Sequence, residues 1–157
     1  MDAELQQSWE RHLRKARESS CRLILIVGEE GTGKTTLLQA LSDAFHIPRI
    51  NVGEDLSRKL LTVEVEDRAR RTDETLAELI NDAGSDSVAL DNTEILFQPE
   101  LALKPLEALK AAARTRLIIA TWNGKVADGC ISFGWPAHPA HRIYTLKDHP
   151  EITVNPQ

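Results

Sequence analysis

One short stretch of the sequence combines the residue types that hold phosphate groups. It fits the pattern G-x-x-x-x-G-K-[ST] without a mismatch and reads Gly28, Glu29, Glu30, Gly31, Thr32, Gly33, Lys34, Thr35. Glycines let the main chain curl so that its N–H groups face phosphate oxygens, and a lysine adds a mobile positive charge for the β- and γ-phosphates. A threonine hydroxyl is a ligand for Mg²⁺. The stretch therefore predicts a nucleoside triphosphate site, with Thr36 completing the set of predicted cofactor-binding residues.

Two glutamates stand inside this predicted anion-binding loop, which is an unusual place for negative charge. Glu29 and Glu30 follow the first glycine directly. The side chains can face solvent while the amides face the phosphates. We therefore expect them to tune the affinity for nucleotide and not to abolish binding.

A second acidic position is needed for the shell of a bound Mg²⁺. Three apolar residues, 88–90, end in Asp91, which resembles the Walker B pattern and makes Asp91 and Thr35 the predicted metal residues. Asn92 stands where many related ATPases have a glutamate that activates water, and an amide cannot accept a proton as a carboxylate does. Glu94 could serve instead, provided that the chain turns there; otherwise it caps the following segment. At the end of the expected strand 117–121, Thr121 or Asn123 could sense the γ-phosphate, unless these residues only form a turn. The predicted catalytic residues are Lys34, Asp91, Asn92, Glu94 and Asn123.

The elements that must position these residues alternate between strand and helix. Apolar strands are expected at 23–27, 47–52, 88–91, 117–121 and 142–146, and helices at 2–19, 33–45, 68–83 and 100–113. Such alternation predicts one α/β domain over 1–157, a P-loop NTPase of the AAA-like (ASCE) class. We expect a five-stranded parallel sheet flanked by helices, a loose tail at 147–157 and no C-terminal helical lid. Ligands of such sheets bind at the carboxyl ends of the strands, where the predicted loop begins.

Composition narrows the class of protein further. The chain has 157 residues, a formal net charge of -5 and no apolar run long enough to cross a bilayer, so we expect a cytoplasmic protein with no membrane contact. Neither the net charge nor the composition indicates nucleic acid, although the basic face at Arg11, Arg14, Lys15 and Arg17 leaves DNA contact open. Cys21 and Cys130 lie far apart and do not suggest a disulfide framework.

The long connection at 122–141 contains residue types found in metal sites and in contact surfaces. Cys130, His138 and His141 offer only three ligands and lack a paired C-x-x-C, so zinc is not expected. The aromatic residues Trp122, Phe133 and Trp135 either mark a contact surface or cover the core. Part of the connection is expected to form a hairpin around 131–135.

Several longer segments resemble a known family. "INVGEDLSRKLL", "VALDNTEILF" and "TWNGKVADGCISFGWPAHPAHRIY", together with the phosphate loop, resemble BrxF, the small P-loop protein of type III BREX bacteriophage-defence systems. The resemblance implies an ATP-binding component that works with other BREX proteins. It places the family's ATP-site residues on Gly28, Gly31, Gly33, Lys34, Thr35 and Asp91.

These observations lead to an expected function and to alternatives. The expected protein is a Mg²⁺-dependent ATPase that is slow without self-association or a partner supplying an arginine. Arg114, Arg116 and Arg142 lie near expected strand starts, so they favour action on another subunit. The alternatives are a nucleotide-sensing adaptor with little hydrolysis, a DNA-associated assembly subunit, and a small-molecule kinase, for which no arginine-rich lid is evident.

Overall fold

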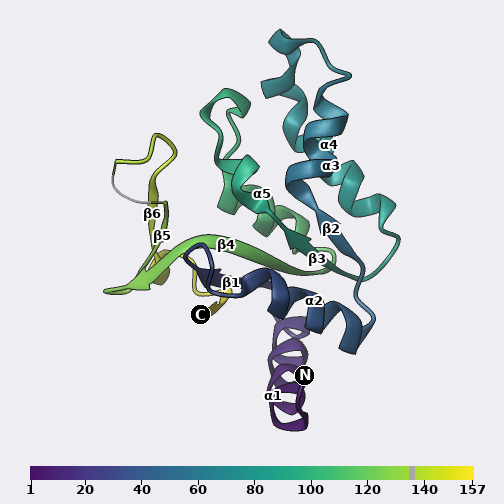
Figure 1. Ribbon diagram of the computed structural model, residues 1–157, viewed down its shortest axis with the longest axis vertical. Coiled ribbons are helices and arrows are strands. Elements are labelled where there is room, and N and C mark those ends of the chain that lie inside the picture. Colours follow the sequence, from purple (N-terminus) through teal and green to yellow (C-terminus); the bar gives the residue numbers. More distant parts are fainter. Residues whose placement is uncertain (135–136) are drawn as a thin grey trace.

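The computed structural model describes residues 1–134 and 137–157, and a five-stranded parallel sheet forms its centre. The strands follow the order β2-β3-β4-β1-β7, with every neighbouring pair parallel (Figure 1). Their bounds are β1 Leu23–Gly28, β2 Arg49–Asn51, β3 Ser87–Asp91, β4 Leu117–Ala127 and β7 Thr153–Pro156. Because all five strands run the same way, their carboxyl ends meet at one edge of the sheet.

In the part of the chain that the structure describes, five α-helices connect and cover these strands. They are α1 Ala3–Arg17, α2 Lys34–Phe45, α3 Val52–Leu60, α4 Arg68–Asp82 and α5 Pro105–Ala112. The connections also contain the 3₁₀ helices η1 Val65–Asp67, η2 Thr93–Phe97, η3 Pro99–Leu101 and η4 Leu146–Asp148. Within the described residues, none of these helices has the length and apolar character needed to span a membrane.

The alternation of side chains along β1 builds two cores, one on each face of the sheet. Leu23, Leu25 and Val27 pack on the face covered by α3, α4 and α5, while Ile24 and Ile26 pack on the face covered by α1 and α2. All five side chains are buried. A strand buried on both faces must be apolar throughout, which explains the continuous run in the sequence.

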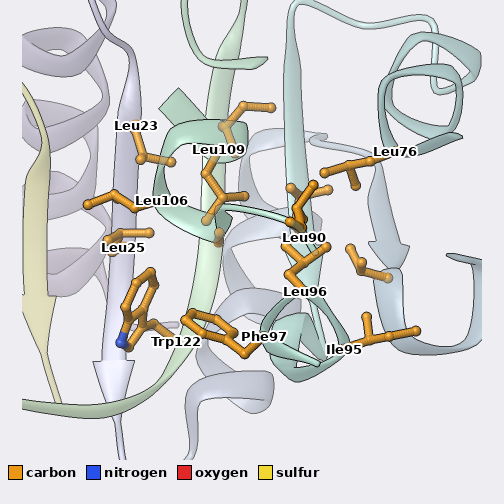
Figure 2. Packing of buried hydrophobic residues seen from close by; sticks show 14 of the residues in the cluster. Leu23, Leu25, Leu76, Leu90, Ile95, Leu96, Phe97, Leu106, Leu109 and Trp122 are labelled. Carbon is orange, nitrogen blue, oxygen red and sulfur yellow. The ribbon is translucent and has the colours of Figure 1, made fainter. Parts of the chain in front are cut away.

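An aromatic group closes the larger core near the carboxyl edge (Figure 2). The rings of Phe97 and Phe133 stack at a centroid distance of 3.6 Å, and Trp122 meets Phe97 edge-to-face at 4.9 Å. Trp122 is fully buried, and its indole N–H donates to the carbonyl of Ser132. Of the two interpretations of the aromatic connection, the structure supports core packing for Trp122 and Phe133. Trp135 and the end of the predicted hairpin at 131–135 lie outside the described residues.

The fifth parallel strand is not the one that the sequence predicted. The segment expected to be that strand contains β6, Arg142–Thr145, which pairs antiparallel with β5, Cys130–Phe133; β5 in turn pairs with the far half of β4. The place beside β1 is taken by β7, so the expected loose tail at 147–157 contains an ordered strand. β7 was missed because its sequence, TVNP, includes a proline and carries little apolar signal of its own.

Several element boundaries also differ from the sequence prediction; the strand expected at 117–121, for example, continues as β4 to Ala127. The helix expected from residue 100 begins only at Pro105, because a proline disfavours helical geometry in the residue before it and is well accommodated in a first turn. The strand expected at 47–52 ends at Asn51, whose side chain accepts a hydrogen bond from the Glu54 amide and so starts α3.

Candidate functional site

The loop between β1 and α2 places glycine backbone along a cleft at the carboxyl edge. Gly31 and Gly33 line this cleft with φ angles of 83° and 90°, a region that disfavours residues with a side chain. Gly33 is also the N-cap of α2, whose first amides have no partner within the helix. The arrangement places the positive end of the α2 dipole at the cleft, which suits an anion.

Lys34 is the charged side chain at the base of the loop. It is 7% exposed, and its Nζ donates to the carbonyl oxygen of Glu29 at 2.9 Å. Burial lowers the pKa of Lys34, while the negative charges of Glu94, Asp91 and Glu30 act in the opposite direction. The ammonium group is therefore poorly hydrated and has remaining donors for an anionic ligand.

Asp91 lies at the end of β3 and faces the first turn of α2. Its Oδ1 accepts hydrogen bonds from Thr35 Oγ1 at 3.1 Å, Thr121 Oγ1 at 3.3 Å and the Asn92 amide at 2.9 Å. The carboxylate is 4% exposed, and within the described part of the chain no hydrogen bond reaches Oδ2. The two predicted metal residues thus lie together, with one carboxylate oxygen and one hydroxyl available to a hard cation.

A sharp turn after Asp91 brings Glu94 back toward the cleft. Asn92 takes the left-handed conformation, with φ 52° and ψ 53°, and η2 follows at once. Glu94 Oε1 then accepts a hydrogen bond from Asn123 Nδ2, at the point where β4 passes beyond the parallel sheet. The chain therefore makes the turn that a catalytic role for Glu94 requires, and it joins two predicted catalytic side chains.

These residues form one cleft of about 660 Å³. Its lining residues come from the loop, from α2 and from the ends of β3 and β4: Glu30, Gly31, Gly33, Lys34, Thr35, Thr36, Asp91, Asn92, Glu94, Thr121 and Asn123. All five predicted catalytic residues are among them. Thr121 and Asn123, the two residues that the sequence offered as sensors of the γ-phosphate, both line the cleft.

Three residues of the predicted loop do not line the cleft: Gly28, Glu29 and Thr32. Thr32 Oγ1 donates to the Glu29 carbonyl at 2.8 Å, which closes the loop on itself. Glu29 is exposed and lies 3.4 Å from Lys125, as expected of a solvent-facing side chain. Glu30 is exposed too, but it lines the cleft, so its charge acts directly on any anion bound there.

Another hollow, of about 690 Å³, lies between α4 and α5 and differs in chemistry. Alanines contribute much of its wall, together with Leu76 and Ile80, and it includes no residue of the phosphate loop. Volume alone does not separate the two hollows. The convergence of a buried lysine, a buried carboxylate and glycine backbone identifies the cleft at the carboxyl edge as the candidate site.

The histidines of the long connection hold its backbone in place. His138 Nδ1 accepts from the Ala140 amide at 2.9 Å, and His141 Nδ1 lies 2.9 Å from the Phe133 carbonyl oxygen. Across residues 1–134 and 137–157, no group of three or more His, Cys, Asp or Glu side chains is arranged to hold a metal by itself. A cation at Asp91 and Thr35 would thus need phosphate oxygens and water as further ligands.

Comparison with known proteins gives one family match. A family model described as an AAA domain matches residues 16–120, about two thirds of the chain. No curated protein matches.

Two solved structures are similar over much of the chain. PCH-2 of C. elegans is 20% identical, with a TM-score of 0.48, over 98% of this chain and 41% of that one. A DNA replication initiation factor is 17% identical, with a TM-score of 0.43, over 77% of this chain and 39% of that one. The chain thus spans about two fifths of the length of either protein.

Proposed function

The chain belongs to the AAA domain family, and we propose that it binds Mg²⁺–ATP in the cleft at the carboxyl edge and hydrolyses it slowly. The observation that carries the proposal is the 3.1 Å hydrogen bond between Thr35 and Asp91, beside the buried Lys34. AAA domains of the P-loop type bind nucleotide with Mg²⁺, and these side chains fit that pair of ligands. Thr35 and Asp91 supply hard oxygen ligands, and Lys34 faces the anion.

The loop residues have distinct roles in this proposal. Backbone amides from 28–33 and at Thr36 cradle the phosphates, with Lys34 Nζ directed at the β- and γ-phosphates. When bound, Mg²⁺ supplies positive charge that offsets the charge on the transferred phosphoryl group. Thr35 Oγ1 and Asp91 would hold the shell of this ion, and Thr121 positions the Asp91 carboxylate through its 3.3 Å hydrogen bond.

Glu94 is the proposed general base, and Asn123 is its positioning partner. A carboxylate accepts a proton from an attacking water, whereas Asn92 can only orient one. Because Asn123 donates to Glu94 Oε1, the carboxylate is held in place and one of its oxygens is occupied. We expect that this hydrogen bond must be released for full activity, so hydrolysis by the isolated chain is expected to be slow.

The charge balance of the cleft supports a need for a second molecule. Lys34 is the one basic residue among its described lining residues, against the acidic Glu30, Asp91 and Glu94. Arg116 is engaged elsewhere, because its guanidinium donates to the Ile80 carbonyl and to Asn81 Oδ1. An arginine supplied by a neighbouring copy or by a partner would accelerate phosphoryl transfer by about 10³–10⁵.

The biological setting that we propose is a BREX-type defence complex in the cytoplasm. Its support is the resemblance of "INVGEDLSRKLL" and "LDNTEILF" to the BrxF family. In cells carrying such a system, a Lys34→Ala substitution is expected to restore phage plaque formation. Full protection by that variant would contradict an ATP-dependent role in defence.

Glu94→Gln tests the proposed enzyme activity. Glutamine keeps the acceptor for Asn123 but cannot take a proton, so phosphate release should fall by about 100-fold or more while ATP affinity stays within about threefold. Glu78→Gln, at an exposed position on α4, is the matched control. The measurement is phosphate release and ATP binding on the same preparations, alone and with candidate partners.

A nucleotide-sensing adaptor is the second candidate function. It is favoured by the exposed Asn92 directly after Asp91 and by the hydrogen bond that occupies Glu94. Tight ATP binding with no phosphate release by the wild-type chain, in any assembly tested, would establish the adaptor and remove the enzyme.

A further inference from the structure

The connection between α3 and α4 exposes apolar side chains from a fixed backbone. Leu61 and Val65 are 73% and 71% exposed, the largest exposures among the bulky apolar residues described. Arg68 Nε donates to the carbonyls of Leu60 at 3.0 Å and Val63 at 3.1 Å, which holds the connection in place. Apolar groups presented on a held backbone lose little entropy when a partner covers them.

Two carboxylates flank this tip, which we define as residues 61–66. Glu64 and Glu66 are exposed and make no ion pair within the described residues. Nearby basic side chains are already matched: Arg58 with Glu54 and Asp55, Lys59 with Asp82, Arg70 with Asp67, and Arg71 with Glu74. The tip is thus an apolar projection with unpaired negative charge beside it.

A hollow with two arginines lies at the junction of α1 and α2. It has a volume of about 460 Å³ and is lined by Glu10, Leu13, Arg14, Arg17, Glu18 and Phe45. Its accessible apolar floor is the half-buried Phe45, because Leu13 is almost fully buried. Arg14 and Arg17 are exposed, and neither forms an ion pair in the part of the chain that the structure describes. The Arg17 guanidinium donates a hydrogen bond to Ser87 Oγ at 3.2 Å.

We propose that the tip of one copy of this chain docks into the α1–α2 hollow of a second copy. The tip and α1 lie at opposite ends of the long axis, so one molecule cannot satisfy both surfaces itself (Figure 1). Leu61 and Val65 would cover the floor of the hollow, with Glu64 and Glu66 beside Arg14 and Arg17. Such a head-to-tail contact joins unlike surfaces and propagates from copy to copy. This contact does not involve the nucleotide cleft. The proposal therefore does not depend on whether the chain hydrolyses ATP.

The hollow favours a protein partner over DNA. Its two arginines are matched in number by Glu10 and Glu18, so the lining has no net positive charge with which to bind a continuous run of phosphates. A projection that combines apolar groups with a few carboxylates fits this mixed lining better than a uniform polyanion does. A tip of six residues buries less than the roughly 1,200 Å² of a standard interface, so the association is weak and sensitive to salt.

Charge reversal on each surface tests the contact. Wild-type chain without nucleotide should show an average mass that rises with concentration, measured by sedimentation up to about 1 mM. Arg14→Glu with Arg17→Glu should abolish the rise, and so should Glu64→Arg with Glu66→Arg. An equimolar mixture of the two variants should restore association. The unaltered tip of the first variant meets the unaltered hollow of the second, and the basic tip of the second meets the acidic hollow of the first.

Further variants separate this contact from a folding defect and from DNA binding. Leu61→Ser with Val65→Ser should abolish association without touching α1, and Lys147→Glu with Glu78→Arg, at exposed positions elsewhere, should leave it unchanged. Unfolding midpoints report on folding.

A monomeric wild type at all concentrations, or a mixture that fails to associate, overturns the proposal. Salt-dependent binding of duplex DNA by a monomeric wild type, lost in Arg14→Glu with Arg17→Glu, would assign the surface to DNA instead.

Discussion

At the scale of single residues, the candidate site depends on groups that are costly to bury without a partner. Lys34 and Asp91 are both nearly inaccessible, and each has hydrogen-bonding capacity directed at the cleft. Burying an ammonium and a carboxylate beside glycine backbone gains little for stability. A buried ammonium next to a buried carboxylate is instead what a site for an anion and a cation requires.

Lys34→Ala should weaken ATP binding by about 10- to 100-fold. The estimate follows from losing charge-assisted hydrogen bonds that contribute roughly 1.5–3 kcal/mol. The fold should persist, because the phosphate loop is outside both cores. Titration calorimetry measures the affinity, the unfolding midpoint reports on the fold, and Lys147→Ala at an exposed position is the control. Unchanged affinity in Lys34→Ala would exclude the site.

The lowered pKa of Lys34 predicts how ATP affinity changes in alkaline solution. Binding requires the protonated ammonium, and burial lowers the pKa of Lys34, so affinity should be full near neutral pH and fall as pH rises. The fall should begin below the ordinary lysine value of about 10.4. ATP dissociation constants measured from about pH 7 to about pH 10 test this. Lys34→Arg keeps its proton and should show no such decline; an equal decline in that variant would assign the titration to another group.

At the scale of elements, β4 connects the site with the hairpin beyond it. Its first residues pair in parallel with β1 and β3, while 124–127 pair antiparallel with β5. Trp122 and Asn123 stand where the pairing changes, so one side chain packs in the core and the next reaches Glu94. Asn123 therefore lies on the same continuous strand as the half of β4 that forms the hairpin.

An ion pair attaches the segment before β7 to α5. Removal of this ion pair should loosen the edge strand β7. Lys110 Nζ contacts Glu151, just before β7, and lies 3.0 Å from His149 Nδ1. The hydrogen bond from Lys110 lowers the pKa of Glu151, so the stabilisation is present above the usual glutamate pKa and is lost as pH falls through the lowered value. Glu151→Gln should therefore cost about 1 kcal/mol at neutral pH and less in acid.

Urea unfolding at neutral and acidic pH, with hydrogen exchange of β7, checks this expectation. Glu78→Gln, an exposed position without an ion pair among the described residues, is the comparison. A stability difference between wild type and Glu151→Gln that persists unchanged in acid would mean that the ion pair is not its cause.

At the scale of the whole molecule, the strand order brings the site together. β3 and β4 lie on the same side of β1, so Asp91 and Asn123 converge on the loop that follows β1. Residues from segments far apart in the sequence thus meet at one edge, and the site exists only in the folded chain. A ligand bound there should stabilise the entire fold by mass action.

Mg²⁺–ATP at about 100 times its dissociation constant should raise stability by about 2.7 kcal/mol, or the unfolding midpoint by about 5–10 °C. Removing Mg²⁺ with a chelator should reduce the rise in the wild type. Asp91→Asn keeps the three accepted hydrogen bonds but should respond equally with and without Mg²⁺. A scanning calorimetry experiment in which Asp91→Asn keeps the wild-type Mg²⁺ dependence would exclude Asp91 from the metal shell.

The sequence by itself determined the parts of this protein that depend on local chemistry. The glycine and lysine pattern at 28–35 predicts an anion-binding turn, because few other residues allow its backbone geometry. Apolar runs such as 23–27 predict strands buried on both faces, and the AAA-like fold expected from their alternation is confirmed.

Only the tertiary structure decided which segments meet. β7 is a strand because β1 offers its edge, and β6 belongs to the hairpin because β5 precedes it; neither choice is visible in a four-residue pattern. The contact of Glu94 with Asn123 likewise depends on a left-handed turn at Asn92 and on the place of β4. Pairing between distant segments is set by the edges and faces that the rest of the fold leaves open, and local periodicity carries no record of them.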